Sequence, residues 1–493
     1  MAGSPRCIMF QGTGSDVGKT VLVAGLCRVA KNRGISVAPF KPQNMSNNAA
    51  VADPDKFGDG GEIGRGQWLQ ALACGRAASV HMNPVLLKPQ SAIGSQVVVQ
   101  GKVVGTAKAR EYQSMKPQLL NSVMDSFSKI SEDADLVLIE GAGSPAEINL
   151  RAGDIANMGF ACEARVPVVL VGDIDRGGVI ASIVGTHTIL PDADRDMIAG
   201  FLINKFRGDV SLFDDGLLEI SKYTGWPSFG ILPYLDAVRR LPAEDSVALE
   251  RLILEGKSGV KIVVPVLGKI ANFDDFDPLG AEPGVDLVFL RKGDSFPTDT
   301  DMIILPGSKS TIADLLELRG NGWEQSIKDH AANGKQVIGI CGGYQMLGQI
   351  ISDPDGLEGE ARSIAGLGLL NVETILHPEK VTRNTKPDSV EFDVALTGYE
   401  IHMGATSGPE CVRPMIKLDG RRDGAISADG KVRGCYLHGL FGSDEYRHKL
   451  LEGLGGSAQV SSYREGVETA LDELAEQIEE HLDVDAMFDL SLN

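Results

Sequence analysis

A glycine-rich segment near the start of the sequence has the residue types and the spacing of a phosphate-binding loop. The segment GTGSDVGKT, residues 12–20, follows an apolar stretch (7–11) and opens a predicted helix (18–32). The glycines let successive backbone N–H groups face an anion at the helix N-terminus. Lys19 can reach the β- and γ-phosphates, and the Thr20 hydroxyl can join a Mg²⁺ shell. We therefore predict an ATP site that includes Gly12, Thr13, Asp16, Gly18, Lys19 and Thr20.

This loop departs from the standard phosphate loop by one residue. Thr13 occupies the position five residues before Gly18, and the nearest suitable upstream glycine is Gly12, one residue farther away. The spacing resembles the variant loop GTxxxxGKT of dethiobiotin synthetase and its relatives. The strand–loop–helix context favours a nucleotide site over a glycine-rich turn that contains GKT by chance.

Polar side chains at the ends of further predicted strands are candidates to contact the metal ion, the substrate or the adenine base of ATP. Glu140 ends an apolar stretch with glycines beside it, and we expect it to bind Mg²⁺ together with Thr20. Asp173 and Asp175 come just after another buried strand and are alternative metal or substrate contacts, which the sequence does not rank. Asn204 also follows a strand, where its amide could read the adenine edge or simply belong to a turn.

A second set of chemical residues lies in the other half of the sequence, where a predicted strand runs into Cys341. Small residues flank this cysteine in GICGGY and a helix is predicted to follow, which is the pattern of a nucleophile elbow that exposes a thiolate. His438, at the end of the apolar stretch 432–437, is the predicted base. We expect the backbone N–H groups of Gly307 and Gly342 to form an oxyanion hole.

The order of oxyanion turn, cysteine and histidine resembles the class I (triad-type) glutamine amidotransferase domain. Enzymes of that class usually carry a glutamate two residues after the histidine, but Leu440 stands at that position here. The group that orients His438 must therefore come from elsewhere or be missing, and the sequence does not identify it.

The elements that must position these residues form two α/β halves. Short, nearly continuous apolar strands alternate with helices, which is typical of parallel sheets covered on both faces. In the first half we expect strands at 7–11, 35–40, 136–139, 167–171 and 197–203. In the second half we expect them at 261–266, 285–290, 302–305 and 337–340.

We predict an α/β protein with two domains and a linker. The first domain, 1–235, is the ATP-binding domain with a parallel sheet similar to dethiobiotin synthetase. A charged stretch, 236–258, is the predicted linker, and 259–493 is the predicted glutamine amidotransferase-like domain. Apolar residues recur at helical spacing from Val467 to Leu482, so we expect an amphipathic C-terminal helix packed on the second domain.

Composition excludes several classes of function. The 493 residues include 47 Lys+Arg and 67 Asp+Glu, a net charge of −20, which argues against a general nucleic-acid binder. The seven cysteines are scattered without a CxxC pair, which is typical of reduced thiols in the cytoplasm. The apolar runs are shorter than the roughly 18 residues that a membrane helix needs. We expect a soluble, cytoplasmic protein without nucleic-acid or membrane partners.

The combination of both motifs with several longer blocks resembles one family. A variant phosphate-loop domain joined to a Cys–His glutaminase is similar to the cobyric acid synthases and the related cobyrinic acid a,c-diamide synthases. The blocks that favour the former are PFKPQNM (39–45), GEIGR (61–65), MNPVLLKP (82–89), GAGSPAEIN (141–149), DIDRGG (173–178), NKFRGD (204–209) and GYEIHMG (398–404). Members of this family typically lack the glutamate after the histidine, so Leu440 does not indicate an inactive enzyme.

The resemblance implies a glutamine-hydrolysing ligase that uses ATP and Mg²⁺. Cobyric acid synthases amidate the b, d, e and g carboxylates of adenosylcobyrinic acid a,c-diamide to give adenosylcobyric acid, so the expected partners are a corrinoid, glutamine and ATP. Because a carboxylate is a poor electrophile, we expect ATP to convert it to an acyl phosphate first. Lys41, Gln43 and Asn44 are candidate contacts to the substrate carboxylate or the γ-phosphate. Glu400 and His402 remain unassigned, as does the oligomeric state.

Two other interpretations are weaker. A cobyrinic acid a,c-diamide synthase would perform the same reaction on different carboxylates, but the PFKPQNM and NKFRGD blocks argue against it. A phosphate-loop ATPase with a non-catalytic glutaminase-like domain would lack glutaminase activity, which the intact pair of Cys341 and His438 makes improbable.

Overall fold

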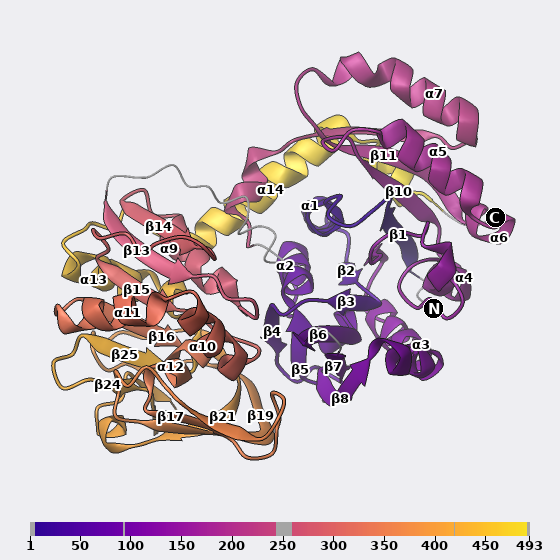
Figure 1. Ribbon diagram of the computed structural model, residues 1–493. Helices are drawn as coiled ribbons and strands as arrows, with labels where there is room; N and C mark the ends of the chain where they lie inside the picture. Colours follow the sequence, from indigo (N-terminus) through magenta and orange to yellow (C-terminus); the bar gives the residue numbers. More distant parts are fainter. Residues whose placement is uncertain (1–4, 92–93, 243–258, 419, 491–493) are drawn as a thin grey trace. The chain divides into compact units, whose positions relative to one another are not determined.

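The computed structural model describes residues 5–91, 94–242, 259–418 and 420–490 (Figure 1). The chain divides into two units. The first contains Met1–Ser46, Ala52–Glu244 and Gly466–Asn493, and the second contains Asn47–Val51 and Asp245–Glu465. Residues 243–258, which make up most of the predicted linker (236–258), lie outside the described residues. The described part of the linker contains the 3₁₀ turn η4 (Asp236–Arg240).

Six parallel strands form the main sheet of the first unit, in the order β12-β11-β10-β1-β9-β2. They are β1 (Arg6–Gly12), β2 (Val37–Phe40), β9 (Leu136–Glu140), β10 (Val168–Asp173), β11 (Ile198–Phe206) and β12 (Ser228–Pro233). Every residue of β2, β9 and β10 is buried, as expected for strands covered on both faces. The predicted parallel α/β architecture of this half is confirmed.

Helices join these strands and cover the sheet (Figure 1). They are α1 (Lys19–Asn32), α2 (Arg65–Cys74), α3 (Ala109–Ser131), α4 (Met158–Ala164), α5 (Val179–Ile189), α6 (Asp192–Arg195) and α7 (Asp214–Thr224). Helix α1 starts directly after the predicted phosphate loop, and its middle residues are all buried. The chain leaves it through Gly34, whose φ of 75° lies in the left-handed region that glycine tolerates best.

A smaller sheet with the order β3-β6-β7-β8 packs beside α3. Its strands are β3 (Gln43–Met45), β6 (Val85–Ser91), β7 (Gly94–Val99) and β8 (Lys102–Lys108), and the short strands β4 (Ala49–Ala52) and β5 (Gly61–Gly64) lie between β3 and α2 in the sequence. Leu87, Val97 and Ala107 form its buried apolar cluster, against which Tyr112 and Met115 of α3 pack. The first turns of α3 therefore pack on the same sheet that carries Gln43 on its edge strand β3.

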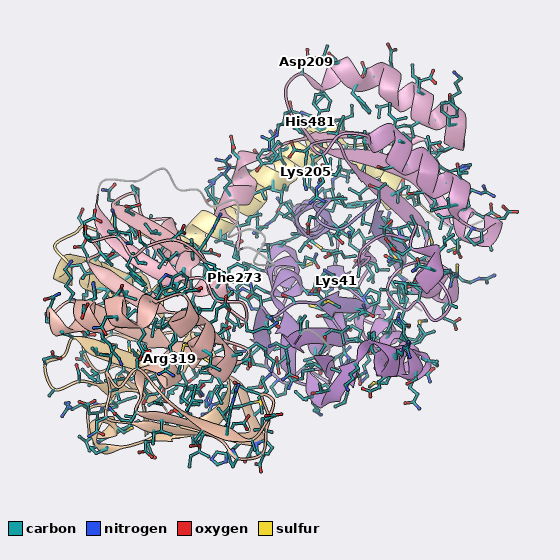
Figure 2. The ribbon with its side chains drawn as sticks, viewed as in Figure 1. Lys41, Lys205, Asp209, Phe273, Arg319 and His481 are labelled. Carbon is teal, nitrogen blue, oxygen red and sulfur yellow. The ribbon has the colours of Figure 1, made fainter. Side chains whose placement is uncertain are left out.

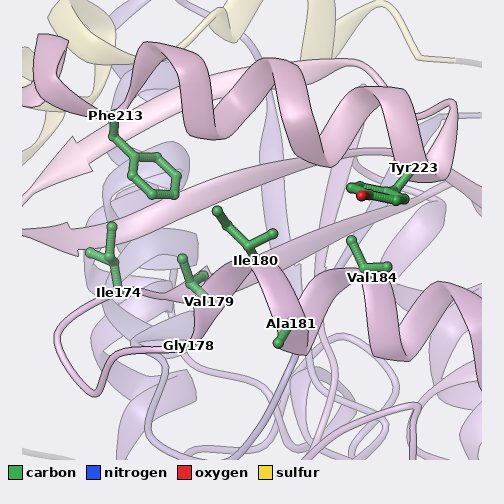
Figure 3. A pocket seen from close by; sticks show the side chains of 8 residues that line it. All are labelled: Ile174, Gly178, Val179, Ile180, Ala181, Val184, Phe213 and Tyr223. Atoms are coloured by element: carbon green, nitrogen blue, oxygen red, sulfur yellow. The ribbon is translucent and has the colours of Figure 1, made fainter.

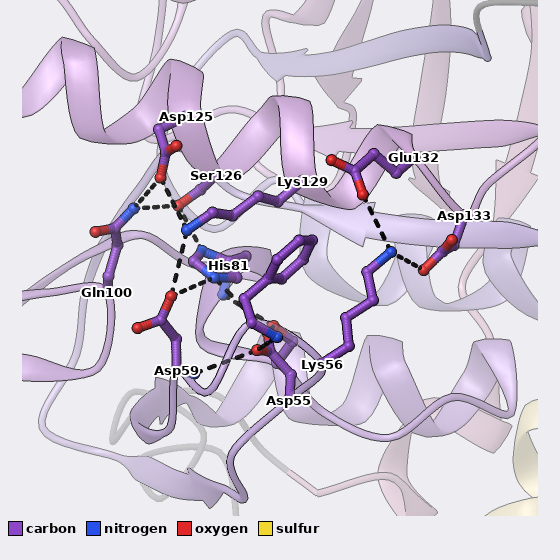
Figure 4. A network of polar contacts seen from close by, with 12 residues as sticks. Asp55, Lys56, Asp59, His81, Gln100, Asp125, Ser126, Lys129, Glu132 and Asp133 are labelled. Atoms are coloured by element: carbon purple, nitrogen blue, oxygen red, sulfur yellow. Dashed lines mark hydrogen bonds and ion pairs between the residues drawn. The ribbon is translucent and has the colours of Figure 1, made fainter.

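A polar network ties the far half of α3 to a neighbouring loop (Figure 4). His81 is fully buried, with Nδ1 2.9 Å from Ser126 Oγ and Nε2 3.2 Å from Asp59 Oδ2. Lys129 Nζ forms ion pairs of 3.2 Å with both Asp59 and Asp125. Burial and the Lys129 charge together lower the pKa of His81, so the ring is neutral and acts as a structural link.

An apolar groove of about 450 Å³ lies between α5 and α7 (Figure 3). Ile174, Val179 and Val184 line one side, and Phe213 and Tyr223 line the other. None of its lining residues is charged, and none is a predicted site residue, so this groove does not correspond to the predicted nucleotide site.

The second unit contains a mostly parallel sheet with the order β14-β13-β15-β16-β25-β24. Its strands are β13 (Val260–Pro265), β14 (Val285–Leu290), β15 (Met302–Leu305), β16 (Gln336–Ile340), β24 (Ala425–Ile426) and β25 (Val432–Cys435), and only the β24–β25 pairing is antiparallel. Its helices are α9 (Asp277–Gly280), α10 (Thr311–Gly320), α11 (Trp323–Ala332), α12 (Gly342–Leu347) and α13 (Asp444–Gly453). The four strands expected in this half are all present.

A second sheet in this unit, β18-β17-β19-β21-β26, changes the predicted position of His438. Its strands are β17 (Ile350–Asp353), β18 (Arg362–Ala365), β19 (Glu373–Thr385), β21 (Gly398–Ser407) and β26 (Leu437–His438), and a small sheet contains β20 (Asp388–Ser389), β22 (Ile416–Leu418) and β23 (Arg421–Asp423). The predicted single strand 432–437 is split: β25 stays beside β16, and β26 pairs antiparallel with β21, where Tyr399 lies opposite His438.

The C-terminal helix packs on the first unit, which corrects our expectation that it belongs to the second domain. From Gly466 onward, α14 (Tyr463–His481) and α15 (Val484–Phe488) are part of the first unit. Leu474 and Ile478 press against Gly25 of α1, and the buried Arg28 pairs with Glu468. The amphipathic pattern of this helix was predicted correctly. Its apolar and acidic residues contact the glycine and the arginine of a helix more than 400 residues away in the sequence.

Among the described residues, no helix is both long and apolar enough to cross a bilayer. All seven cysteines are free thiols.

Replacing Gly25 with alanine tests the close contact between α1 and α14. The new Cβ would lie 2.3 Å from Ile478 Cδ1 and 2.8 Å from Leu474 Cγ, so we expect G25A to lower the free energy of unfolding by about 1–2 kcal/mol in chemical denaturation. The matched control is G185A in α5, where a Cβ meets no atom within 4 Å and the helix propensity of alanine should stabilise the protein. Equal effects of the two substitutions would contradict the observed packing.

Candidate active site

Cys341 sits at a strained turn between β16 and α12. Its backbone has φ 51° and ψ −109°, a left-handed conformation that is unusual for a residue with a side chain. A strained turn from a strand into a helix is the geometry of a nucleophile elbow. The sulfur is almost fully buried and lies 3.5 Å from the carbonyl oxygen of Ile401 on β21. The elbow predicted at Cys341 is therefore present.

His438 is held by a carboxylate that sequence analysis did not identify. Asp275, on the 3₁₀ turn η5 (Phe273–Phe276), accepts a hydrogen bond from His438 Nδ1 at 2.7 Å through Oδ2. Its other oxygen accepts the backbone N–H of Gly439, also at 2.7 Å. The imidazole also stacks on Tyr399, with ring centroids 5.2 Å apart. Asp275 thus orients His438 in place of a glutamate at position 440.

The surroundings of His438 favour its charged form. Burial lowers the pKa of the ring, but the Asp275 carboxylate and the sulfur of Cys341 outweigh burial and raise the pKa to about 10. A protonated imidazole beside the sulfur can donate a proton, which is the role of a histidine next to a nucleophilic cysteine. Cys341, His438 and Asp275 are therefore arranged like the nucleophile, the proton carrier and the orienting group of a catalytic triad.

The predicted oxyanion glycines lie next to this triad. A Cβ on Gly307 would lie 3.0 Å from His438 Cε1, and a Cβ on Gly342 would lie 2.8 Å from the backbone nitrogen of Ser308. The turn after β15 and the first residue after Cys341 are therefore in close contact, which requires glycine at both positions. The structure brings these two backbone segments together beside the nucleophile, where N–H donors could stabilise an oxyanion.

Glu400 and His402 form a polar cluster on β21, next to Ile401, whose carbonyl oxygen contacts the Cys341 sulfur. Glu400 is buried but accepts hydrogen bonds from Arg383 and Arg421, and the His402 ring stacks on Tyr436 with centroids 3.8 Å apart. Burial raises the pKa of Glu400, but His402 and Arg383 outweigh it and lower the pKa to about 2. Glu400 is thus an anion in this cluster at neutral pH.

In the first unit, the phosphate loop has the backbone that its glycines predict. Gly18 has φ 93°, and a Cβ on Gly12 would lie 2.8 Å from Lys19 Nζ. Lys19 Nζ donates to the carbonyl oxygens of Gly14 and Gly143, each at 3.2 Å. The backbone N–H of Thr13 donates to Val171 O on β10 at 3.0 Å, so this residue fastens the loop to the sheet. Lys19 is therefore held over the loop where a phosphate group would bind.

Glu140 is the centre of a buried hydrogen-bond cluster at the end of β9. Its Oε1 accepts from Thr20 Oγ1 at 2.7 Å and from Lys41 Nζ at 2.8 Å. Its Oε2 accepts from Gln70 Nε2 at 2.7 Å and from Gln67 Nε2 at 3.3 Å. The sequence indicated Glu140, Thr20 and Lys41, but it did not indicate the two glutamines of α2. Four donors compensate the buried charge.

The oxygen atoms of Glu140 and Thr20 suit Mg²⁺. Both are hard ligands: Glu140 ends β9, and Thr20 lies in the first turn of α1, directly after the loop that would hold the phosphates. Within the described ranges, no three His, Cys, Asp or Glu side chains converge on one point. A nucleotide-bound Mg²⁺ needs only one or two protein ligands because phosphates and water supply the others.

The other candidate carboxylates are paired with basic side chains. Lys205 Nζ lies 2.8 Å from Asp173 Oδ2, and Arg207 Nε lies 2.6 Å from Asp175 Oδ1. Asn204 Nδ2 donates to Val17 O in the phosphate loop at 2.8 Å, so this amide braces the loop. Asp16 has φ 58° and pairs with Arg176 at 3.1 Å on the exposed side of the loop. Of the three carboxylates, Glu140 contacts Thr20.

The segment after β2 lies against the Glu140 cluster. Lys41, labelled with Lys205 in Figure 2, contacts Glu140 directly, and Asn44 Nδ2 donates to Gln67 Oε1 at 3.0 Å. Gln43 Oε1 instead accepts the hydroxyl of Tyr112 on α3 at 2.5 Å. Two of these three candidates are therefore linked to the proposed metal ligand, and the third faces α3.

Both halves of the chain match known domains, and full-length relatives are similar throughout. Residues 8–248 match the CobQ/CobB/MinD/ParA nucleotide binding domain, and residues 261–446 match the CobB/CobQ-like glutamine amidotransferase domain. The chain is 65% identical over 478 residues to the cobyric acid synthase of Allorhizobium ampelinum, covering 97% of this chain and 98% of that protein. It is 63% identical over 486 residues to that of Brucella suis biovar 1, covering 99% and 100%.

The chain belongs to the cobyric acid synthase family. Membership in this family confirms the predicted pairing of a nucleotide-binding half with a glutamine amidotransferase half.

Asp275 is the main site residue of this cobyric acid synthase family member that sequence analysis missed. It lies 163 residues before His438, in the acidic segment FDDFDP, and no fixed spacing links the two. The absence of a glutamate at position 440 was the only signal that another carboxylate was needed. Selecting it among the acidic residues of the second half requires the tertiary structure.

Substituting Asp275 tests its role in orienting and charging His438. In D275N the ring loses an anionic partner, so the pKa of His438 should fall and the alkaline limb of the glutaminase pH profile should move to lower pH. We expect glutamine hydrolysis to slow by about 10²- to 10⁴-fold. The matched control is D274N on the same 3₁₀ turn, which should keep the wild-type pH profile. An unchanged profile in folded D275N would contradict the assignment.

Proposed function

We propose that this chain converts adenosylcobyrinic acid a,c-diamide to adenosylcobyric acid by amidating the b, d, e and g carboxylates with nitrogen from glutamine and energy from ATP. The supporting observation is that one chain carries two separate chemical sites, the triad of Cys341, His438 and Asp275 and the phosphate loop with its Glu140 cluster. The similarity to cobyric acid synthases along nearly the whole chain supports the choice of acid.

The first unit would activate the acid. Lys19 and the loop N–H groups hold the phosphates, and Thr20 and Glu140 are the proposed ligands of Mg²⁺, which neutralises phosphate charge during transfer. A substrate carboxylate attacks the γ-phosphorus, which forms an acyl phosphate and releases ADP. Lys41, beside Glu140, is suited to hold the negative oxygens of the two reacting groups.

The second unit would supply ammonia. The Cys341 thiolate attacks the glutamine side-chain amide, the oxyanion is stabilised by the N–H groups of Gly307 and Gly342, and His438 protonates the departing nitrogen. Water then hydrolyses the thioester to release glutamate. Ammonia attacks the acyl phosphate and displaces inorganic phosphate, which leaves an amide.

The decisive experiment incubates the protein with Mg²⁺–ATP, glutamine and the a,c-diamide corrinoid and follows the corrinoid by chromatography and mass spectrometry. Stepwise conversion of four carboxylates to amides supports the proposal. In a parallel incubation with cobyrinic acid, amidation at a and c would instead favour the diamide synthase. ATP hydrolysis without any change in either corrinoid would contradict both and favour an ATPase.

Substitutions in the two sites should separate the two half-reactions. C341A should lose glutamine-supported amidation by at least about 10³-fold but keep activity with added ammonium, because ammonia bypasses the thiol. K19A should lose activity with both nitrogen sources by roughly 10²-fold or more, because it weakens the phosphate contacts. The control C411A removes a half-buried thiol of the same unit and should keep both activities. Equal loss of both activities in folded C341A would argue against two separable sites.

A further inference from the structure

Among the described residues of the first unit, four lysines are buried, and one of them differs from the rest in its contacts. Lys19, Lys41 and Lys88 each donate hydrogen bonds to carboxylate or carbonyl oxygens at 2.8–3.2 Å. Lys116 of α3 is only 8% exposed, and its ammonium group has no hydrogen-bond or ion-pair partner in the part of the chain that the structure describes. Most of the Lys116 side chain is withdrawn from water, and partial burial of an ammonium group without a partner costs free energy, so this position calls for an explanation.

The position of Lys116 along α3 places it at the ligand edge of the main sheet. Helix α3 leads into β9, whose far end carries Glu140. Lys116 lies 15 residues before the last residue of the helix, which is about 22 Å at 1.5 Å per residue, whereas β9 spans about 16 Å. Lys116 is therefore at or just above the carboxyl ends of the strands, where open parallel sheets bind ligands.

The neighbours of Lys116 belong to the segments around the Glu140 cluster. Its ammonium lies 5.8 Å from the ring of Tyr112, whose hydroxyl donates to Gln43, one of the candidate substrate contacts. A Cβ on Gly153 would lie 4.0 Å from Lys116 Cδ, so the lysine runs beside the loop that follows Glu140.

The acidic group that attracts Lys116, Asp154, does not neutralise it. Asp154 attracts the ammonium through space, but its carboxylate accepts backbone N–H groups from three residues of its own loop and forms no ion pair with the lysine. Burial accordingly lowers the pKa of Lys116, and the charge of Asp154 offsets only part of this effect. A bound anion would supply the missing partner and recover the cost of burial.

We propose that Lys116 binds a carboxylate of the acid substrate at this edge of the sheet, on the side of Gln43 and Tyr112. The identity of the acid rests on the proposed function, whereas the anion site itself does not. Lysine suits this role because its ammonium is a point charge on a flexible stem, without the fixed planar geometry of arginine. It can therefore hold different carboxylates of one large substrate as they are presented in turn.

The test compares K116M with the wild-type protein in steady-state kinetics. Methionine keeps much of the length and apolar volume of lysine but carries no charge. We expect the KM for the a,c-diamide corrinoid to rise about 10- to 100-fold, while the KM for ATP, the glutaminase rate and kcat at saturating corrinoid change by less than about 3-fold. K116R should recover part of the lost affinity. A KM for ATP that rises instead would assign the anion site to the nucleotide phosphates.

A second arm tests the anion site without the corrinoid. Because K116M removes a largely buried charge that has no partner, its Tm should exceed that of the wild type by about 2–4 °C in chloride. At constant ionic strength, succinate should raise the Tm of the wild type more than that of K116M. The control K129M, on the same helix, removes ion pairs to Asp59 and Asp125, so its Tm should fall while its KM for the corrinoid stays unchanged.

The two arms distinguish the two proposals. If the wild type converts no corrinoid but the succinate effect depends on Lys116, the proposed function fails and the anion site stands. If corrinoid is converted with the same KM in K116M, the assignment of a substrate carboxylate to Lys116 is overturned. If succinate stabilises the wild type and K116M equally, the anion site itself is overturned.

Discussion

One buried carboxylate organises the first unit. Glu140 is 1% exposed, and an isolated charge at that depth would be prohibitively costly, so the fold must deliver donors to it from several directions. They come from the start of α1, from the segment after β2 and from two glutamines of α2. The requirement to satisfy Glu140 therefore fixes the phosphate loop, the lysine of the PFKPQNM block and α2 in one arrangement.

The second unit meets a different electrostatic requirement, and it too depends on one carboxylate. Under the proposed function a thiol attacks an amide, so the group beside it has to be a proton carrier rather than a fixed cation. Asp275 provides the negative charge that keeps His438 protonated, and it also accepts the N–H of Gly439, which fixes the turn that follows β26. A single carboxylate thus sets both the charge and the orientation of the imidazole.

Local patterns in the sequence predicted the strands, the phosphate loop and the elbow at Cys341, because each depends on neighbouring residues. Gly12, Gly18 and Gly342 are recognisable since the backbone conformations and close approaches they permit are local requirements. Asp275, Gln67 and Gln70 were not predicted because their roles depend on contacts between distant segments. The docking of α14 on α1 was misjudged for the same reason: an amphipathic stripe shows that a partner exists but not which one.

The return of α14 to the first unit has a consequence for synthesis on the ribosome. The segments that build the main sheet precede the main part of the second unit, Asp245–Glu465, but the helix that covers Gly25 and pairs with Arg28 follows it. This main part is therefore an insertion, and all of it has been translated before the first unit receives its last helix. The face of α1 that α14 covers in the folded protein therefore stays exposed on the ribosome while more than 200 further residues are translated.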